Sequence, residues 1–165
     1  MKKTILLAAV MMLFAAVACS GSKSEDLVAP PDAEQEQEQE QEQEQESMKT
    51  KIKIAVGGRE FDVTLEDNAA ARDFVSRLPL TLQMEDLNRN EKYGYVSGSL
   101  PANAQRVETI NAGDLMLWTD NCIVLFYKTF TSGYSYTRLG RLDSVSGLAE
   151  AVGDKEVEVT FSLSE

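Results

Sequence analysis

Seven aromatic and basic residues in the second half of the chain could together form a binding groove. They are Tyr93, Tyr95, Lys128, Phe130, Tyr134, Tyr136 and Arg138. Tyrosine combines an apolar ring with a polar hydroxyl, which suits the wall of a groove, and the two cations would attract a carboxylate or a peptide carbonyl. An alternative remains open, in which the tyrosines pack the end of the fold and Arg138 pairs with Glu91 or Asp86.

The residue types limit the catalytic and metal chemistry of the chain. It contains no histidine, which excludes Ser-His-Asp and Cys-His nucleophilic sites and zinc sites built on imidazole. Residues 86–97 imitate a calcium loop, but Glu91 stands where such a loop needs glycine and Ser97 where it needs glutamate. Glu85 and Asp86 would point to opposite faces of a strand, so they do not form an acid–base pair. We therefore predict no catalytic residue, no metal site and no cofactor.

The clearest local structure precedes these residues. Apolar side chains alternate with polar ones over 52–56 and again over 61–65, and Gly57-Gly58 lies between the two runs. Alternation of this kind is typical of half-buried strands, and a Gly-Gly pair suits a tight turn. The pattern predicts a β-hairpin.

A helix is expected next. Ala71, Phe74, Val75 and Leu78 have the spacing of one helix face, and Asp67 or Asn68 could cap its first turn. Pro79 would end it.

Most of the remaining chain reads as strands. Apolar runs or alternation predict strands over 80–87, 93–96, 105–109, 115–118, 122–127, 134–142 and 157–163, with a short helix over 145–152 that ends at Gly153. The continuous apolar runs at 115–118 and 122–127 suit strands that are covered on both faces. A mostly antiparallel sheet of this size avoids exposed edges by closing into a barrel. The fold class predicted is mainly β, a closed barrel with two helices.

Four stretches resemble a known family. They are 82–88 (LQMEDLN), 90–95 (NEKYGY), 113–115 (GDL) and 134–141 (YSYTRLGR). On these residues the chain is similar, over roughly 49–163, to the bacterial cyclophilin-like domain family. The resemblance implies an eight-stranded β-barrel with two helices, a fold shared with the cyclophilin prolyl isomerases. The Phe-His-Arg and Gln-Gly-Gly-Asp segments of true cyclophilins do not occur in this sequence, so no catalytic residue is carried over.

The first nineteen residues have the features of an export signal. Lys2 and Lys3 precede an apolar run too short to span a bilayer comfortably, and residues 16–19 resemble a bacterial lipobox that ends at Cys19. We expect a lipoprotein signal peptide over 1–19 and lipidation of Cys19. Ordinary cleavage after Ala18 is the alternative.

Residues 20–47 are predicted to be a disordered acidic tether, followed by one barrel domain over 48–165. The tether contains a Glu-Gln alternation over 34–46 with no side chain that could build a core. Residues 1–47 carry three lysines and ten acidic residues, hence −7 of the total net charge of −11, which leaves −4 for residues 48–165. No Lys/Arg run is present, so nucleic-acid binding is not expected.

These features predict a membrane-anchored lipoprotein of the bacterial cell envelope, facing the periplasm or the cell surface. Its barrel would bind a peptide, protein or small-molecule ligand without turnover. Two alternatives remain open. One is a divergent peptidyl-prolyl isomerase in which Arg138 polarises the amide, and the other is a structural envelope protein that contacts a partner protein.

Overall fold

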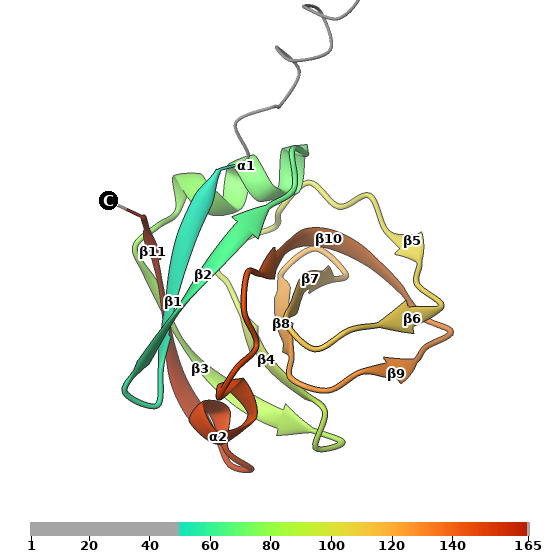
Figure 1. Ribbon diagram of the computed structural model, residues 1–165. Coiled ribbons are helices and arrows are strands. Elements are labelled where there is room, and N and C mark those ends of the chain that lie inside the picture. Colours follow the sequence, from blue (N-terminus) through green and yellow to red (C-terminus); the bar gives the residue numbers. More distant parts are fainter. Residues whose placement is uncertain (1–49, 165) are drawn as a thin grey trace, which may run out of the picture.

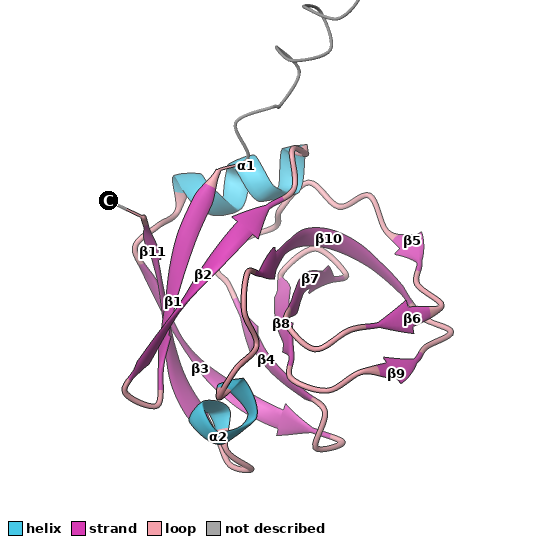
Figure 2. Cartoon of the chain, viewed as in Figure 1, coloured by secondary structure: helices cyan, strands magenta, loops and turns pink. Residues whose placement is uncertain are grey.

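The chain forms a closed antiparallel barrel in a computed structural model that describes residues 50–164 (Figures 1 and 2). The expected signal peptide, Cys19 and the tether lie outside the described residues. Eight strands follow one another around the barrel in the order β2-β1-β11-β3-β4-β8-β7-β10, and β10 pairs back with β2. These strands are β1 (Lys51–Val56), β2 (Arg59–Leu65), β3 (Leu80–Leu87), β4 (Glu91–Tyr95), β7 (Asp114–Trp118), β8 (Cys122–Phe126), β10 (Ser135–Leu142) and β11 (Val157–Leu163). The predicted fold class is confirmed.

The predicted hairpin is present as β1 and β2, in register from Lys51↔Thr64 to Val56↔Arg59. Gly57 and Gly58 both have positive φ, +55° and +74°, which only glycine adopts without strain. A Cβ on Gly57 would also lie 2.2 Å from the carbonyl oxygen of Ala151. The turn therefore requires glycine for its conformation and for its packing against helix α2 (Leu148–Val152).

Helix α1 (Ala69–Ser76) covers one end of the barrel (Figure 1). Of the two predicted caps the structure has Asn68, whose Oδ1 accepts a hydrogen bond of 2.9 Å from the Ala71 amide. Phe74 is fully buried, and its ring meets that of Phe161 edge-to-face at 5.4 Å. Helix α2 is shorter than predicted, because Gly147 at its start has a left-handed φ of +78° that no helix continues through.

The barrel interior holds the larger hydrophobic core. It is built from inward-facing apolar residues of seven of the eight strands, with α1 and α2 closing the two ends. The inward positions of β4 are Lys92 and Gly94. Leu115 and Leu117 of β7 and Ile123 and Leu125 of β8 point inward and are fully buried. Burying such aliphatic side chains is worth roughly 1.5–3 kcal/mol each, so this core carries most of the stability.

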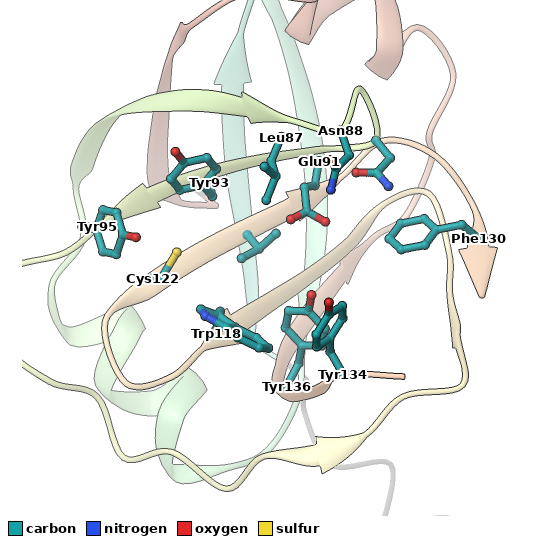
Figure 3. Close-up of a pocket in the computed structure, with 12 residues that line it drawn as sticks. Leu87, Asn88, Glu91, Tyr93, Tyr95, Trp118, Cys122, Phe130, Tyr134 and Tyr136 are labelled. Atoms are coloured by element: carbon teal, nitrogen blue, oxygen red, sulfur yellow. The ribbon is translucent and has the colours of Figure 1, made fainter. Parts of the chain in front are cut away.

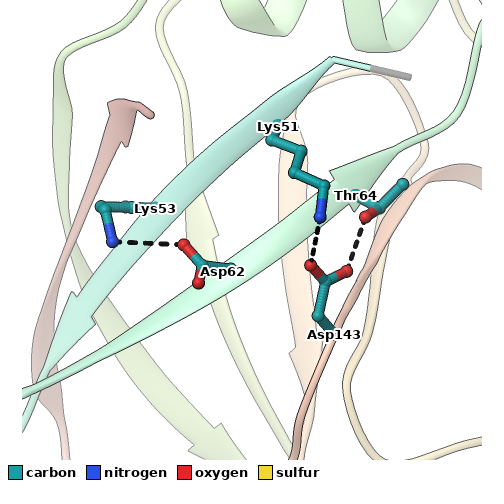
Figure 4. Close-up of polar contacts among 5 residues, drawn as sticks. All are labelled: Lys51, Lys53, Asp62, Thr64 and Asp143. Carbon is teal, nitrogen blue, oxygen red and sulfur yellow. Dashed lines mark hydrogen bonds and ion pairs between the residues drawn. The ribbon is translucent and has the colours of Figure 1, made fainter. Parts of the chain in front are cut away.

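Polar contacts join the two strands that close the barrel (Figure 4). The carboxylate of Asp143, just after β10, accepts hydrogen bonds from Lys51 Nζ at 2.9 Å and from Thr64 Oγ1 at 2.5 Å. Lys53 Nζ on β1 lies 3.2 Å from Asp62 Oδ1 on β2, its partner strand in the hairpin. These groups are largely exposed, so they help to fix the register of β1, β2 and β10 more than they add to stability.

Three short strands lie outside the barrel beside β10 and β8 (Figure 1). They are β5 (Gln105–Arg106), paired with β10, and β6 (Thr109–Ile110), paired with β9 (Phe130–Thr131). The sequence predicted one continuous strand over 105–109 and did not predict β9. The predicted strand is divided because its two ends have different partners. The first end pairs with β10, and the Val107 amide extends that pairing by donating to the carbonyl of Tyr134, whereas Thr109 pairs with β9.

These short strands cover a second hydrophobic cluster on the outer face of the barrel wall. This outer cluster consists of Val107, Ile110, Met116, Cys122, Val124, Phe126 and Tyr136, with Tyr93 and Phe130 packed against it. Strands β7 and β8 are thus buried on both faces, as their continuous apolar runs predicted.

Candidate ligand-binding site

A cavity of about 430 Å³ opens beside the outer cluster (Figure 3). We call it the aromatic cavity. Its walls come from β4, β7, β8, β9, β10 and the β3–β4 turn, and they consist of Leu87, Asn88, Asn90, Glu91, Tyr93, Tyr95, Trp118, Cys122, Val124, Phe130, Tyr134 and Tyr136. A volume of this order falls within the usual range for pockets that hold a small molecule.

Strand alternation places three residues of β4 in this cavity. Glu91, Tyr93 and Tyr95 are two residues apart, so their side chains leave the same, outer face of the strand. In the neighbouring strand β8, Val124 pairs with Tyr93 and Cys122 with Tyr95. The Tyr93 hydroxyl donates a 2.7 Å hydrogen bond to Glu85 Oε2, which fixes the ring.

A second aromatic wall is formed by Trp118, Tyr134 and Tyr136. The indole of Trp118 lies edge-to-face with the ring of Tyr134, with centroids 5.6 Å apart, and its centroid is 5.2 Å from that of Tyr136. The backbone of Tyr134 is held by the short outer segments, since its carbonyl accepts from the Val107 amide and its amide donates to Ser132 Oγ at 3.2 Å. The wall is therefore positioned by packing and by hydrogen bonds outside the barrel.

Glu91 is the charged residue of the cavity. Its side chain is 8% exposed, and its carboxylate points toward the space between Phe130, Trp118 and Tyr136 (Figure 3). The carboxylate makes no ion pair or hydrogen bond to another side chain among residues 50–164. Burial, and to a lesser extent the negative charge of Asp86, raise the pKa of the Glu91 carboxyl to about 7. At neutral pH this group is therefore poised between its two protonation states.

Two further cavity residues keep their protons at neutral pH. Burial raises the pKa of the Cys122 thiol to about 11, and burial together with the charge of Glu91 raises the pKa of the Tyr136 hydroxyl to about 12. Glu91 is consequently the cavity group whose charge changes near neutrality.

Behind the cavity wall, inside the barrel, lies a buried ion pair. Lys92 is fully buried, and its Nζ is 2.9 Å from Asp86 Oδ2 and 2.5 Å from the carbonyl oxygen of Lys155. Tyr127 donates a 2.6 Å hydrogen bond to the same Asp86 oxygen. Burial alone would raise the pKa of Asp86, but the hydrogen bonds from Tyr127 and Lys92 hold it below its ordinary value. Lys92 is thus occupied and does not reach Glu91.

A family model, described as the Cyclophilin-like family, matches residues 54–162. This chain belongs to the cyclophilin-like family. Among solved structures, the hypothetical protein AF2241 from Archaeoglobus fulgidus is similar to this cyclophilin-like barrel at 19% sequence identity, with a TM-score of 0.48. The similarity covers 73% of this chain and 98% of that one. No curated protein matches the sequence.

The cyclophilin-like barrel brings five of the seven predicted groove residues together. Tyr93, Tyr95, Phe130, Tyr134 and Tyr136 all line the aromatic cavity. Their convergence follows from the pairing of β4 with β8 and from the packing of Phe130 and Tyr136 against the same ring, that of Phe126 on β8.

The two predicted cations lie elsewhere in the cyclophilin-like barrel. Lys128 is exposed and does not line the cavity, and its ammonium lies 5.8 Å from the centre of the Tyr127 ring. Arg138 is exposed and lines a separate hollow near the start of α1, with Asn68 and Pro101. The alternative pairing of Arg138 with Glu91 or Asp86 is wrong, because Asp86 pairs with Lys92 and Glu91 makes no ion pair among the described residues.

Sequence reasoning missed two residues that define the cavity, Glu91 and Trp118. Glu91 lies two positions before Tyr93, so extending the alternation of β4 by one step would have found it. Trp118 is the chain's single tryptophan and ends an apolar strand opposite Cys122. Trp118 reaches the cavity from the end of β7 at the β7–β8 turn, and no local pattern in the sequence shows that this turn lies close to the tyrosines.

The described part of the cyclophilin-like chain offers no cluster of three or more acidic or cysteine side chains that could hold a metal ion. None of its helices has the length and apolar character needed to cross a membrane.

Proposed function

We propose that this protein is a binding module, in which the barrel holds a small ligand or a peptide side chain in the aromatic cavity without chemical turnover. One observation carries the proposal. Among the described residues, six large hydrophobic side chains are exposed, and four of them, Leu87, Tyr95, Trp118 and Tyr134, line this one cavity. Exposed apolar surface gathered at a single hollow is characteristic of a binding site.

Binding without turnover is supported by the residues that line the cavity. An isomerase of the cyclophilin kind would need a cation beside the bound amide, and the lining contains neither lysine nor arginine. Arg138, the candidate for that role, lines a different hollow. The cavity thus offers shape, ring faces and one carboxyl group.

The binding test uses the single tryptophan as a reporter. Trp118 is 37% exposed and lines the cavity, so its fluorescence should change when a ligand enters. A fragment and peptide library is screened against the full-length chain by Trp118 fluorescence and by amide shifts in NMR spectra. We expect ligands that shift β4, β7 and Tyr134 and that bind at least tenfold more weakly to Tyr134→Ala, by analogy with aromatic anchors at interfaces.

Tyr134 is 63% exposed, so its truncation should leave the fold intact. The matched control is Leu163→Ala, which removes another exposed apolar side chain on the far strand β11. The binding function is contradicted if no library member binds at the cavity, or if the ligands bind Tyr134→Ala as tightly as they bind the wild-type chain.

We further propose that the barrel is held at a membrane of the bacterial envelope through acylated Cys19. The proposal rests on the apolar run and the small residues that precede this cysteine. In fractionated cells the wild-type chain should appear with the membranes, and Cys19→Ala should appear in the soluble fraction. Retention of Cys19→Ala in the membrane fraction would refute the anchor.

A further inference from the structure

The charge inside the aromatic cavity has one sign. Glu91 is the charged side chain among the residues that line it. The neighbouring cation, Lys92, is turned to the barrel interior and held by Asp86 at 2.9 Å. A carboxylate that is 8% exposed and has no cation beside it is costly to ionise unless a positive charge enters from outside.

The lining also contains a buried hydrogen-bond acceptor that has no partner in the described part of the chain. Asn90 also lines the cavity, and its Oδ1 is a buried acceptor with no hydrogen-bond partner among the described residues. Glu91, when ionised, offers two more acceptor oxygens. A ligand that supplies donors or positive charge would satisfy both residues.

The rings around Glu91 suit the same kind of ligand. Six of the lining residues carry aromatic rings, and they come from more than one wall of the cavity. They are Tyr93, Tyr95, Trp118, Phe130, Tyr134 and Tyr136. Ring faces carry partial negative charge and attract alkylammonium groups, most strongly for tryptophan and where several rings enclose the cation.

We infer that the ligand carries an organic ammonium group, which the rings enclose and which pairs with the carboxylate of Glu91. This inference rests on the proposed binding function and names the chemical class of its ligand. The ammonium could belong to a small amine or to a modified lysine side chain, and the cavity of about 430 Å³ has room for either.

The test compares a cation with a neutral molecule of the same shape. Choline and uncharged 3,3-dimethylbutan-1-ol are titrated into the full-length chain, and binding is followed by Trp118 fluorescence and calorimetry. We expect choline to bind about tenfold or more tightly than the alcohol, since the alcohol gains neither the ion pair nor the cation–ring attraction.

Two variants locate the effect. Glu91→Gln keeps the side-chain shape and should remove most of choline's advantage over the alcohol. Glu150→Gln, at an exposed position of α2, makes the same change in net charge and should leave both affinities unchanged.

A peptide carrying trimethyl-lysine is the third ligand. If it binds more tightly than choline, the ammonium comes from a protein chain, and otherwise from a small molecule.

The outcomes separate this inference from the binding function itself. Equal affinity for choline and the alcohol, or a choline affinity that survives Glu91→Gln, overturns the cationic ligand while leaving the cavity as a binding site. Absence of any choline binding also overturns it, and the library screen then decides whether the cavity binds at all. The comparison of choline with the alcohol is made on the wild-type chain, so this part of the test does not depend on how the variants fold.

Discussion

Glu91 and Lys92 are adjacent in β4 and carry opposite charges, yet they lie on opposite faces of the barrel wall. Glu91 faces the aromatic cavity, while Lys92 faces the interior and lies 2.9 Å from Asp86. The alternation of a β-strand forces this separation, because successive side chains point to opposite faces. One strand thus supplies the cation of a core ion pair and, to the cavity, a carboxyl group that no cation among the described residues neutralises.

The first prediction concerns the ion pair in the core. Lys92→Met keeps the length of the buried side chain but leaves Asp86 without its cation, which should cost about 3–5 kcal/mol of unfolding free energy. Urea unfolding at neutral pH measures the loss. Lys51→Met, which removes a surface partner of Asp143, should cost much less unfolding free energy, because an exposed ion pair contributes little. Equal losses in the two variants would show that burial of Lys92–Asp86 has no special effect.

The second prediction concerns the stability of the barrel at different pH values. The Glu91 pKa is raised from 4.5 to about 7 in the folded state, so the folded barrel prefers the protonated carboxyl. Its contribution to stability is complete below about pH 4.5 and is lost as the pH rises through about 7. Glu91→Gln should therefore match the wild type at pH 4.5 and be more stable at pH 8, by up to about 3 kcal/mol. A difference between the two chains that is independent of pH contradicts this assignment.

The third prediction concerns the pH dependence of ligand affinity. Near Glu91, the groups with shifted pKa values are Asp86 on β3, Tyr93 on β4, Cys122 on β8 and Tyr136 on β10. The pKa of Asp86 is lowered and those of the other three are raised, so none of them changes charge between pH 6 and pH 8. Choline carries a permanent charge, so its affinity should rise about tenfold from pH 6 to pH 8 as Glu91 ionises. The same titrations on Glu91→Gln should give a flat profile, and a rise that persists in this variant would assign the effect to another group.

The fourth prediction is that the chain has no appreciable prolyl isomerase activity. The barrier to rotation is about 18–20 kcal/mol, and its catalysis requires groups that favour the twisted amide over both planar forms. The aromatic cavity offers no arginine for this purpose, and Arg138 lies at a different hollow. A proline-peptide isomerisation assay on the full-length chain, with Arg138→Ala beside it, checks this expectation. A clear rate increase that disappears in Arg138→Ala would make the chain an enzyme.

The parts of the fold that local patterns control were predictable from the sequence. Alternation identified the β1–β2 hairpin and β11, and the cap at Asn68 placed the start of α1. The short strands β5, β6 and β9 were mostly not predictable, because two-residue pairings depend on which segments meet in space and leave almost no periodic signal.

For the candidate site too, local patterns were predictable from the sequence and contacts in space were not. Tyr93 and Tyr95 share a face by alternation, so sequence reasoning grouped them correctly. The same alternation grouped Arg138 with Tyr136, and the structure does place these two residues beside one hollow. That hollow lies near the start of α1, however, and is separate from the aromatic cavity. Which hollow a residue of β10 reaches depends on the segments that pack beside the strand, and alternation along the strand does not give this.

The residues that stabilise the barrel differ from those that shape the cavity. The inner cluster holds the barrel together, while Phe130 and Tyr134 reach the cavity from short segments laid over the outside of the wall. Substitutions in those outer segments can alter the shape and chemistry of the cavity while the barrel's ladders remain paired. Related barrels can therefore diverge in what they recognise without rebuilding their fold, and ligand preference should vary most among relatives at positions 128–134.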